Sequence, residues 1–158
     1  ITRFTMTNYD TLNQQALALL GDEPDVVANL ANISSLLFNE LSDINWAGFY
    51  LYKDTQLVLG PFQGRPACIR IPMGKGVCGT AAQTLTIQCI KDVHDFPGHI
   101  ACDAASNSEI VLPLVVKGEL FGVLDIDAPI FDRFTAADET GLTQLAVILV
   151  NHLERMGL

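Results

Sequence analysis

The stretch EIVLPLVVKGELFGVLDID, residues 109–127, decides the fold of this chain. Two runs rich in Val, Leu and Ile flank a Lys-Gly-Glu segment at 117–119, a composition typical of two strands joined by a tight turn. Successive side chains of a strand point to opposite faces of the sheet. The stretch therefore predicts an antiparallel hairpin in which Asp125 and Asp127 share one face.

The segments before this hairpin also indicate short strands. WAGFYLYKDTQLVLGPFQG has two apolar and aromatic runs around a turn signal at Lys53-Asp54-Thr55, which predicts a second hairpin. The remaining predictions for the central part of the chain are a strand at 67–72, a short helix within 74–84, a strand at 87–93 and a loop at 94–107.

Both ends of the chain have helical periodicity. Apolar residues recur every three or four positions in 11–21, 23–43 and 134–156. Thr135 and Asp138 predict a capping box at the start of the last helix. Helices at both ends and about six strands between them predict an α+β fold, a central antiparallel sheet with the N- and C-terminal helices on one face. A ligand would then lie on the other face, under the loops within 60–108.

The composition favours one globular domain over residues 1–158. Of the 158 residues 49% are hydrophobic, and the net charge is −9. The chain has no basic stripe for phosphate groups, so we expect no nucleic-acid partner and no anionic membrane surface. The N-terminal residues are too polar for a secretory signal, and we expect a cytoplasmic protein.

Four cysteines lie in the central third of the chain: Cys68, Cys78, Cys89 and Cys102. Cys102 lies among small polar residues, which favours an accessible, reactive thiol over an inert core residue. Cys68 could face either core or pocket, Cys78 has glycines close by, and Cys89 fits an ordinary half-buried strand position. Two cysteines and two histidines (Cys89, His94, His99 and Cys102) could formally bind zinc, but no CxxC pair exists, so we predict no metal site and no cofactor.

Three carboxylates should converge at one end of the sheet. Glu109 begins the strand that pairs with the one carrying Asp125 and Asp127. Three acids in contact are unfavourable unless a cation lies among them or one is protonated; the alternative is a solvated strand end. Asp103 and Glu109 would raise the pKa of a nearby thiol, so we expect a compensating positive charge. The candidates are an ammonium group of the ligand, His99, Arg70, Lys75 or a helix N-terminus.

Two aromatic residues could complete such a pocket. Trp46 and Tyr50 share one face of the first predicted strand, and Phe49 has the other face. Aromatic residues at these positions more often fill a core, yet a Trp and a Tyr together also suit a methyl–sulfur group. A protonated carboxyl beside a thiolate suits reduction of a sulfoxide, in which the thiolate attacks sulfur and the acid protonates oxygen.

These segments resemble a known family. INWAGFYL (44–51), LVLGPFQGRPACIRIPMGKGVCGTA (57–81), DVHDFPGHIACDAASNSEIVLPL (92–114) and GVLDID (122–127) are similar, in this order, to the free methionine-(R)-sulfoxide reductases, single domains of the GAF fold. The resemblance implies reduction of free L-methionine-(R)-sulfoxide, with thioredoxin as reductant and a homodimer as the assembly. A GAF module that senses a small molecule without turnover is the alternative.

The resemblance also implies a role for each matching residue. Cys102 corresponds to the nucleophile that becomes a sulfenic acid, and Cys68 to the thiol that closes a disulfide with it. Cys78 corresponds to a third cysteine that pairs with the nucleophile in some members, so the resolving thiol stays open between Cys68 and Cys78. The remaining matches are to substrate-binding residues: Glu109, Asp125, Asp127, Trp46 and Tyr50.

Overall fold

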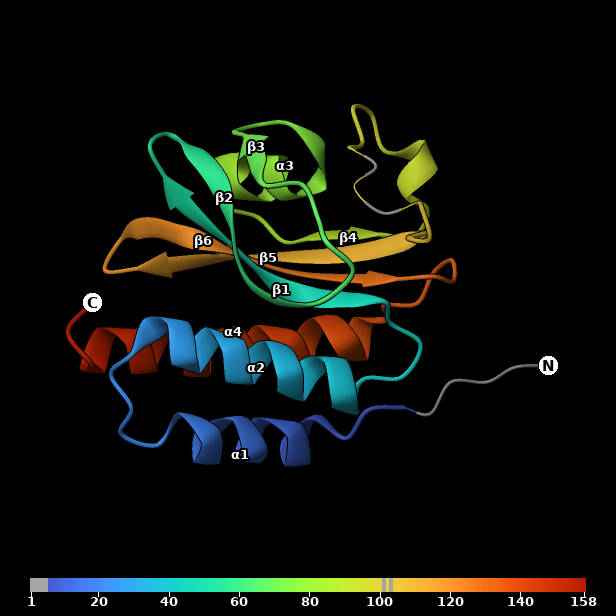
Figure 1. Ribbon diagram of the computed structural model, residues 1–158. Helices are drawn as coiled ribbons and strands as arrows, with labels where there is room; N and C mark the ends of the chain where they lie inside the picture. The colour runs from blue at the N-terminus through green and yellow to red at the C-terminus, as the bar shows by residue number, and fades with distance from the viewer. Residues whose placement is uncertain (1–5, 101, 103) are drawn as a thin grey trace.

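The computed structural model describes residues 6–100, 102 and 104–158 (Figure 1). The elements in chain order are α1 (Tyr9–Leu20), α2 (Val26–Glu40), β1 (Trp46–Lys53), β2 (Gln56–Gly64), β3 (Arg70–Pro72), α3 (Gly76–Thr84), β4 (Gln88–Ile90), a 3₁₀ turn (Val93–Asp95), β5 (Ser108–Val116), β6 (Glu119–Ala128) and α4 (Ala136–Arg155).

The strands form one six-stranded antiparallel sheet in the order β3-β2-β1-β6-β5-β4. Helices α2 and α4 lie against one face, and α1 packs on their outer side, whereas α3 and the long connections lie on the other face of the sheet (Figure 1). This arrangement confirms the predicted α+β class with terminal helices on one face. It leaves the opposite face of the sheet to be covered by α3 and by loops.

The hairpin at 109–127 is β5 and β6. Lys117 and Gly118 form its two-residue turn with φ of 51° and 79°, and positive φ at both positions matches the right-handed twist of the flanking strands. Glu119, which we had placed in the turn, is the first residue of β6. The second predicted hairpin is β1 and β2, which turn at Asp54 and Thr55.

Two predicted strands are shorter in the structure. The strand predicted at 67–72 is only β3, Arg70–Pro72, because the carbonyl of Cys68 accepts a hydrogen bond from the Tyr50 hydroxyl, at 2.8 Å, and so has a side-chain partner. The strand predicted at 87–93 ends at Ile90. Asp92 accepts a hydrogen bond from the backbone N–H of His94 and begins the 3₁₀ turn instead.

The three long helices begin at capping residues. Asn8 and Asp25 accept hydrogen bonds from backbone N–H groups of α1 and α2. Thr135 and Asp138 form the predicted capping box of α4. None of the described helices has both the length and the apolar character that crossing a bilayer requires.

The sheet separates two apolar clusters. Phe49 packs with the three long helices, whereas Trp46 and Tyr50 pack with α3 on the opposite face, as the alternation along β1 predicted. Gly48 lies between these aromatic residues, and a Cβ there would overlap Phe62 of β2. The missing side chain lets Phe62 stack on Trp46, with ring centroids 5.1 Å apart.

A buried ion pair connects the helices of the helical layer. Arg133 is 1% exposed, and its guanidinium donates to Asp138, at 3.0 Å, and to the carbonyl of Ser42, at 2.9 Å. Asp138 also accepts a hydrogen bond from the Tyr9 hydroxyl, at 2.7 Å. One carboxylate therefore joins the start of α1 to the start of α4, and its partner Arg133 joins both to the connection before β1.

We expect Asp138→Ala to lower the free energy of unfolding by about 3–5 kcal/mol, because it leaves a buried guanidinium without its counterion. Urea unfolding followed by circular dichroism measures this change. Glu139→Ala removes a carboxylate from the same first turn of α4 without breaking the pair and should cost less than about 1 kcal/mol. Equal losses in the two variants would contradict the assigned role of the ion pair.

Candidate active site

A pocket opens on the face of the sheet opposite the three long helices. Its space is continuous with solvent. Strands β1, β5 and β6 contribute to its lining, together with the first turn of α3 and residues from the connections before β3 and after β4. Seven predicted site residues line it: Trp46, Tyr50, Cys78, Cys102, Glu109, Asp125 and Asp127.

Strand register brings the three carboxylates together. Asp127 of β6 pairs with Trp46 on one side and with Glu109 on the other. Asp125 follows two residues earlier on the same face. Glu109 is 8% and Asp125 5% exposed, and Asp125 Oδ1 is buried without a hydrogen-bond partner in the part of the chain that the structure describes. An acceptor in this position is available to a donor on a ligand.

Burial raises the pKa of Asp125 well above its usual range, and the charges of Asp127 and Glu109 raise it further. Desolvation disfavours the ionised form, and so do like charges nearby. Asp125 is therefore the carboxyl of this cluster that is best suited to hold a proton. A carboxylic acid so placed can donate that proton to a developing oxyanion.

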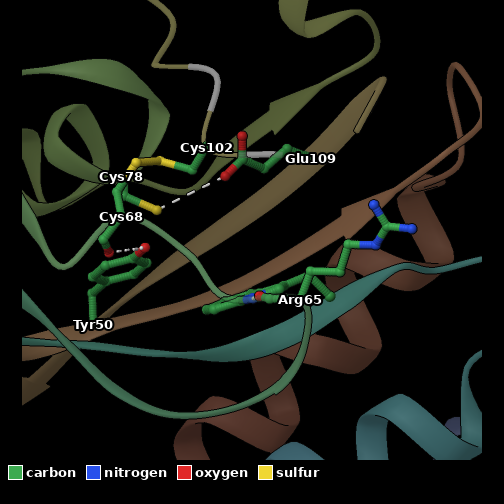
Figure 2. The surroundings of a disulfide bond; sticks show 7 residues. Tyr50, Arg65, Cys68, Cys78, Cys102 and Glu109 are labelled. Atoms are coloured by element: carbon green, nitrogen blue, oxygen red, sulfur yellow. Dashed lines mark hydrogen bonds between the residues drawn. A yellow bond between two sulfur atoms is a disulfide. The ribbon is translucent and has the colours of Figure 1, made fainter. Parts of the chain in front are cut away.

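A disulfide joins Cys68 and Cys102 at the rim of the pocket (Figure 2). Both cysteines are half-buried. Cys102 lines the pocket together with Glu109, and Figure 2 shows Glu109 on the Cys102 side of the bond and Tyr50 on the Cys68 side. The predicted nucleophile thus lies beside the carboxylates, and the thiol bonded to it is Cys68.

Cys78 is a free, buried thiol in the first turn of α3. Its Sγ donates to Glu109 Oε2 over 3.8 Å. Burial raises the pKa of the Cys78 thiol well above its ordinary value, and Asp125 and Glu109 add to this effect, which favours the neutral thiol. Cys89, in β4, is half-buried as predicted, and its Sγ contacts the Phe134 carbonyl on the helical side.

The aromatic pair holds one rim of the pocket in place. The Trp46 indole donates to the carbonyl of Arg65 at 3.1 Å, and the Tyr50 hydroxyl donates to the carbonyl of Cys68. Burial, followed by the charge of Asp125, raises the pKa of the Tyr50 phenol, which keeps it a donor. The two rings line the pocket and also fix the backbone that carries Cys68.

Two of the three predicted cationic side chains reach the pocket. His99 and Lys75 line it, whereas Arg70 is exposed at the start of β3 and is not among the described lining residues. The first turn of α3 also faces the pocket with Gly76, and the N–H groups of a first turn lack partners within their helix. Asp103, the other acid near Cys102 in the sequence, lies outside the described residues.

The sequence did not predict that Ser106 lines the pocket or that Cys78 lies close to both Glu109 and Asp125. Ser106 lines the pocket and is fixed by the Asn45 side-chain amide at 3.1 Å; a lone serine in a loop gives no signal of this contact. Cys78, Glu109 and Asp125 have potential metal-ligand atoms within 4.8 Å of one another, whereas Cys102 of the earlier zinc candidates is bonded to Cys68. These candidate ligand atoms come from Cys78 of α3, Glu109 of β5 and Asp125 of β6.

The six-stranded sheet, its helical layer and the pocket on its free face are the architecture of a GAF domain. The profile of the GAF domain family matches residues 27–154. A free methionine-R-sulfoxide reductase of Escherichia coli is 62% identical over 141 residues, which cover 89% of this chain and 86% of that protein. The chain therefore belongs to the GAF domain family and, within it, to the family of the free methionine-R-sulfoxide reductases.

Solved structures extend this similarity. The fRMsr of Staphylococcus aureus in complex with its substrate is 51% identical with a TM-score of 0.92, and the match covers 96% of this chain and 99% of that chain. A putative GAF sensor protein of Burkholderia vietnamiensis is 55% identical with a TM-score of 0.91, and the match covers 94% of each chain.

The raised pKa of Asp125 predicts a pH-dependent contribution to stability. Between the unfolded and the folded pKa the folded chain binds more protons, so the free energy of unfolding falls as the pH rises. Asp125→Asn removes this pH-dependent contribution. The free energy of unfolding of the wild type minus that of the variant should therefore fall steadily above about pH 4. Urea unfolding of both oxidised proteins up to about pH 8 measures the difference.

The exposed Asp22 provides the control. Asp22→Asn removes a solvated carboxyl and should leave the wild-type pH dependence in place. If the free energies of unfolding of wild type and Asp125→Asn changed in parallel with pH, Asp125 would have the same pKa in the folded protein as in the unfolded chain.

Proposed function

We propose that this protein reduces free L-methionine-(R)-sulfoxide to L-methionine, with Cys102 as nucleophile and Cys68 as resolving thiol. The observation that carries the proposal is the Cys68–Cys102 disulfide at the rim of a pocket that contains three carboxylates. A reactive sulfur pair beside an anionic small-molecule pocket suits a small, amine-bearing oxidant. The similarity to enzymes named free methionine-R-sulfoxide reductases supports the same substrate.

The pocket suits the three parts of such a substrate. The ammonium group would lie at Glu109 and Asp127, where its charge offsets the repulsion between buried acids. The α-carboxylate would lie at the first turn of α3, where backbone N–H groups and Lys75 favour an anion. The methyl–sulfur group would contact Trp46, because sulfur and aromatic rings interact favourably.

The reaction needs one thiolate and one proton in its first step. The Cys102 thiolate attacks the sulfoxide sulfur and forms an S–S bond while Asp125 protonates the oxygen. The hydroxyl group then passes to Cys102 Sγ as the S–S and S–O bonds to the substrate sulfur break, so that methionine leaves and Cys102 becomes a sulfenic acid. The raised pKa of Asp125 supports it as the donor. The Cys68 thiol then attacks the sulfenic sulfur, and water leaves as the disulfide forms.

Cys68 is favoured over Cys78 as the resolving thiol. Cys68 is bonded to Cys102, whereas the neutral Cys78 thiol hydrogen-bonds to Glu109. We assign Cys78 to the pocket wall, where it orients a substrate-binding carboxylate. Reduction of the disulfide by thioredoxin, a homodimeric assembly and a single catalytic domain over residues 1–158 are expectations that follow from the family resemblance.

A GAF module that binds a small molecule without turnover is the second candidate, favoured by the similarity to the protein titled a putative GAF sensor. The two functions differ in what happens to the thiols. An enzyme mixed with methionine sulfoxide and no reductant loses the Cys68 and Cys102 thiols of each chain, whereas a sensor loses none.

Cys102→Ser should abolish turnover and leave the fold intact, because a hydroxyl does not replace the thiolate nucleophile. Cys68→Ser should release about one methionine per chain in a single turnover and then stop with thioredoxin, because no disulfide forms. Cys89→Ser, outside the pocket, should keep wild-type activity. Methionine release measured by chromatography tests all three, and steady-state turnover by Cys102→Ser would exclude the assigned nucleophile.

The acid cluster predicts selectivity for the free amino acid. N-acetylmethionine-(R)-sulfoxide carries a neutral, larger amide in place of the ammonium group, and we expect its kcat/KM to be about 10–100-fold lower than that of the free form. The free S epimer controls for the sulfur centre, because it keeps the ammonium group and reverses the S–O direction. NADPH oxidation coupled through thioredoxin and its reductase measures all three, and equal rates for free and acetylated R forms would exclude ammonium recognition.

A further inference from the structure

The segment that contains Cys68 is basic, although the chain as a whole is acidic. Residues 55–91 contain no Asp or Glu and include four of the nine Lys and Arg residues of a chain with net charge −9. Two of these bases, Arg65 and Arg70, flank Cys68 in the sequence and are exposed. The segment belongs to β2, β3, α3 and β4, which Figure 1 shows in green to yellow-green.

The surface beside Cys68 is also apolar. Ile69 is 67% exposed, and Pro66 and Pro72 are exposed on either side of it. Arg70 begins β3, which is an edge strand of the sheet. An exposed apolar side chain between a basic residue and a half-buried disulfide offers a partner protein both apolar and charged contacts.

The two sulfurs of the disulfide lie in different surroundings. Cys102 faces the pocket with its carboxylates, and the loop that leads to it carries Asp92 and Asp95. On the Cys68 side, Asp54, in the turn before β2, is the described acid nearest in sequence. A thiolate approaching Cys102 would meet negative charge, whereas one approaching Cys68 would pass Ile69 and Arg70.

We propose that Ile69, Arg70 and the neighbouring prolines form the docking surface for a small, acidic dithiol protein that reduces this disulfide by attacking Cys68 Sγ. The proposal rests on the proposed function, which requires the disulfide to be reopened after each turnover. Charge complementarity argues for an acidic partner, because opposite charges steer the encounter and like charges suppress it.

The exchange balances in two steps. One partner thiolate bonds to Cys68 Sγ, the Cys68–Cys102 bond breaks, and its electron pair leaves on Cys102 as a thiolate. The second partner thiolate attacks the mixed disulfide, Cys68 leaves as a thiolate that takes up a proton, and the partner becomes the oxidised disulfide. Attack in line with the bond comes from the side away from Cys102. The first step thus returns the nucleophile directly to the pocket while the partner occupies the outer surface.

Charge and apolar variants of the patch test the surface. With thioredoxin as reductant, Arg70→Glu and Ile69→Ser should each raise the KM for thioredoxin about tenfold, whereas turnover with dithiothreitol should stay within about twofold of wild type. The matched controls are Lys117→Glu, about 25 Å from Glu109 along β5, and Val27→Ser, which is 64% exposed on α2. Equal KM values for thioredoxin in Arg70→Glu and Lys117→Glu would overturn the proposed surface.

A trapping experiment tests which sulfur is attacked. Thioredoxin with the second cysteine of its pair replaced by serine should form a mixed disulfide that peptide mass analysis locates on Cys68; a bond to Cys102 would overturn the proposal. Trapping uses the oxidised protein and does not depend on sulfoxide turnover. Failure of the proposed function, seen as no turnover with dithiothreitol, is therefore distinguishable from failure of the docking surface.

The dependence of kcat/KM for thioredoxin on ionic strength is a further test of the docking surface. For wild type, kcat/KM for thioredoxin should fall several-fold as ionic strength rises from about 0.01 M to 0.15 M, because the Debye length shortens from about 30 Å to 8 Å. Arg70→Glu should lose most of this dependence, and reactions with the uncharged dithiothreitol should show none. A wild-type rate that is independent of salt would contradict electrostatic docking.

Discussion

The pocket depends on one electrostatic constraint: three carboxylates, two buried and one half-buried, lie together on the same face of a sheet. Glu109, Asp125 and Asp127 are aligned by strand register, and burial together with the charges of Asp127 and Glu109 raises the pKa of Asp125. The conflict is relieved by a proton on Asp125 or by a cation among the three. In the proposed function, this site favours a ligand that brings positive charge and donates a proton to it.

The opposite face of the sheet supplies the rigidity that this constraint requires. The three long helices bury one large apolar cluster, and the Arg133–Asp138 pair ties their ends to the connection before β1. A strand that carries apolar residues on one face and acids on the other cannot shift by a single residue without exchanging the two sets. The helical core therefore fixes which side chains enter the pocket.

In the proposed function, substrate and reductant approach the two sulfurs at the rim of the pocket from different sides. Cys102 faces the carboxylates, and Cys68 lies beside an exposed apolar and basic surface. Hydrogen bonds from Trp46 and Tyr50 hold the backbone of the Cys68 segment. The same aromatic residues thus line the pocket and support the sulfur that the proposed partner would attack.

The sequence by itself determined the two hairpins, the three long helices, the capping box at Thr135 and the common face of Asp125 and Asp127, because periodicity and turn composition are local properties. It did not determine where β3 begins, because Cys68 leaves the strand through a contact with Tyr50 that is distant in the chain. Only the tertiary structure decided that Cys68 bonds to Cys102, that Cys78 contacts Glu109 and that Arg70 lies outside the pocket. Burial and long-range register govern these features, and no local pattern encodes them.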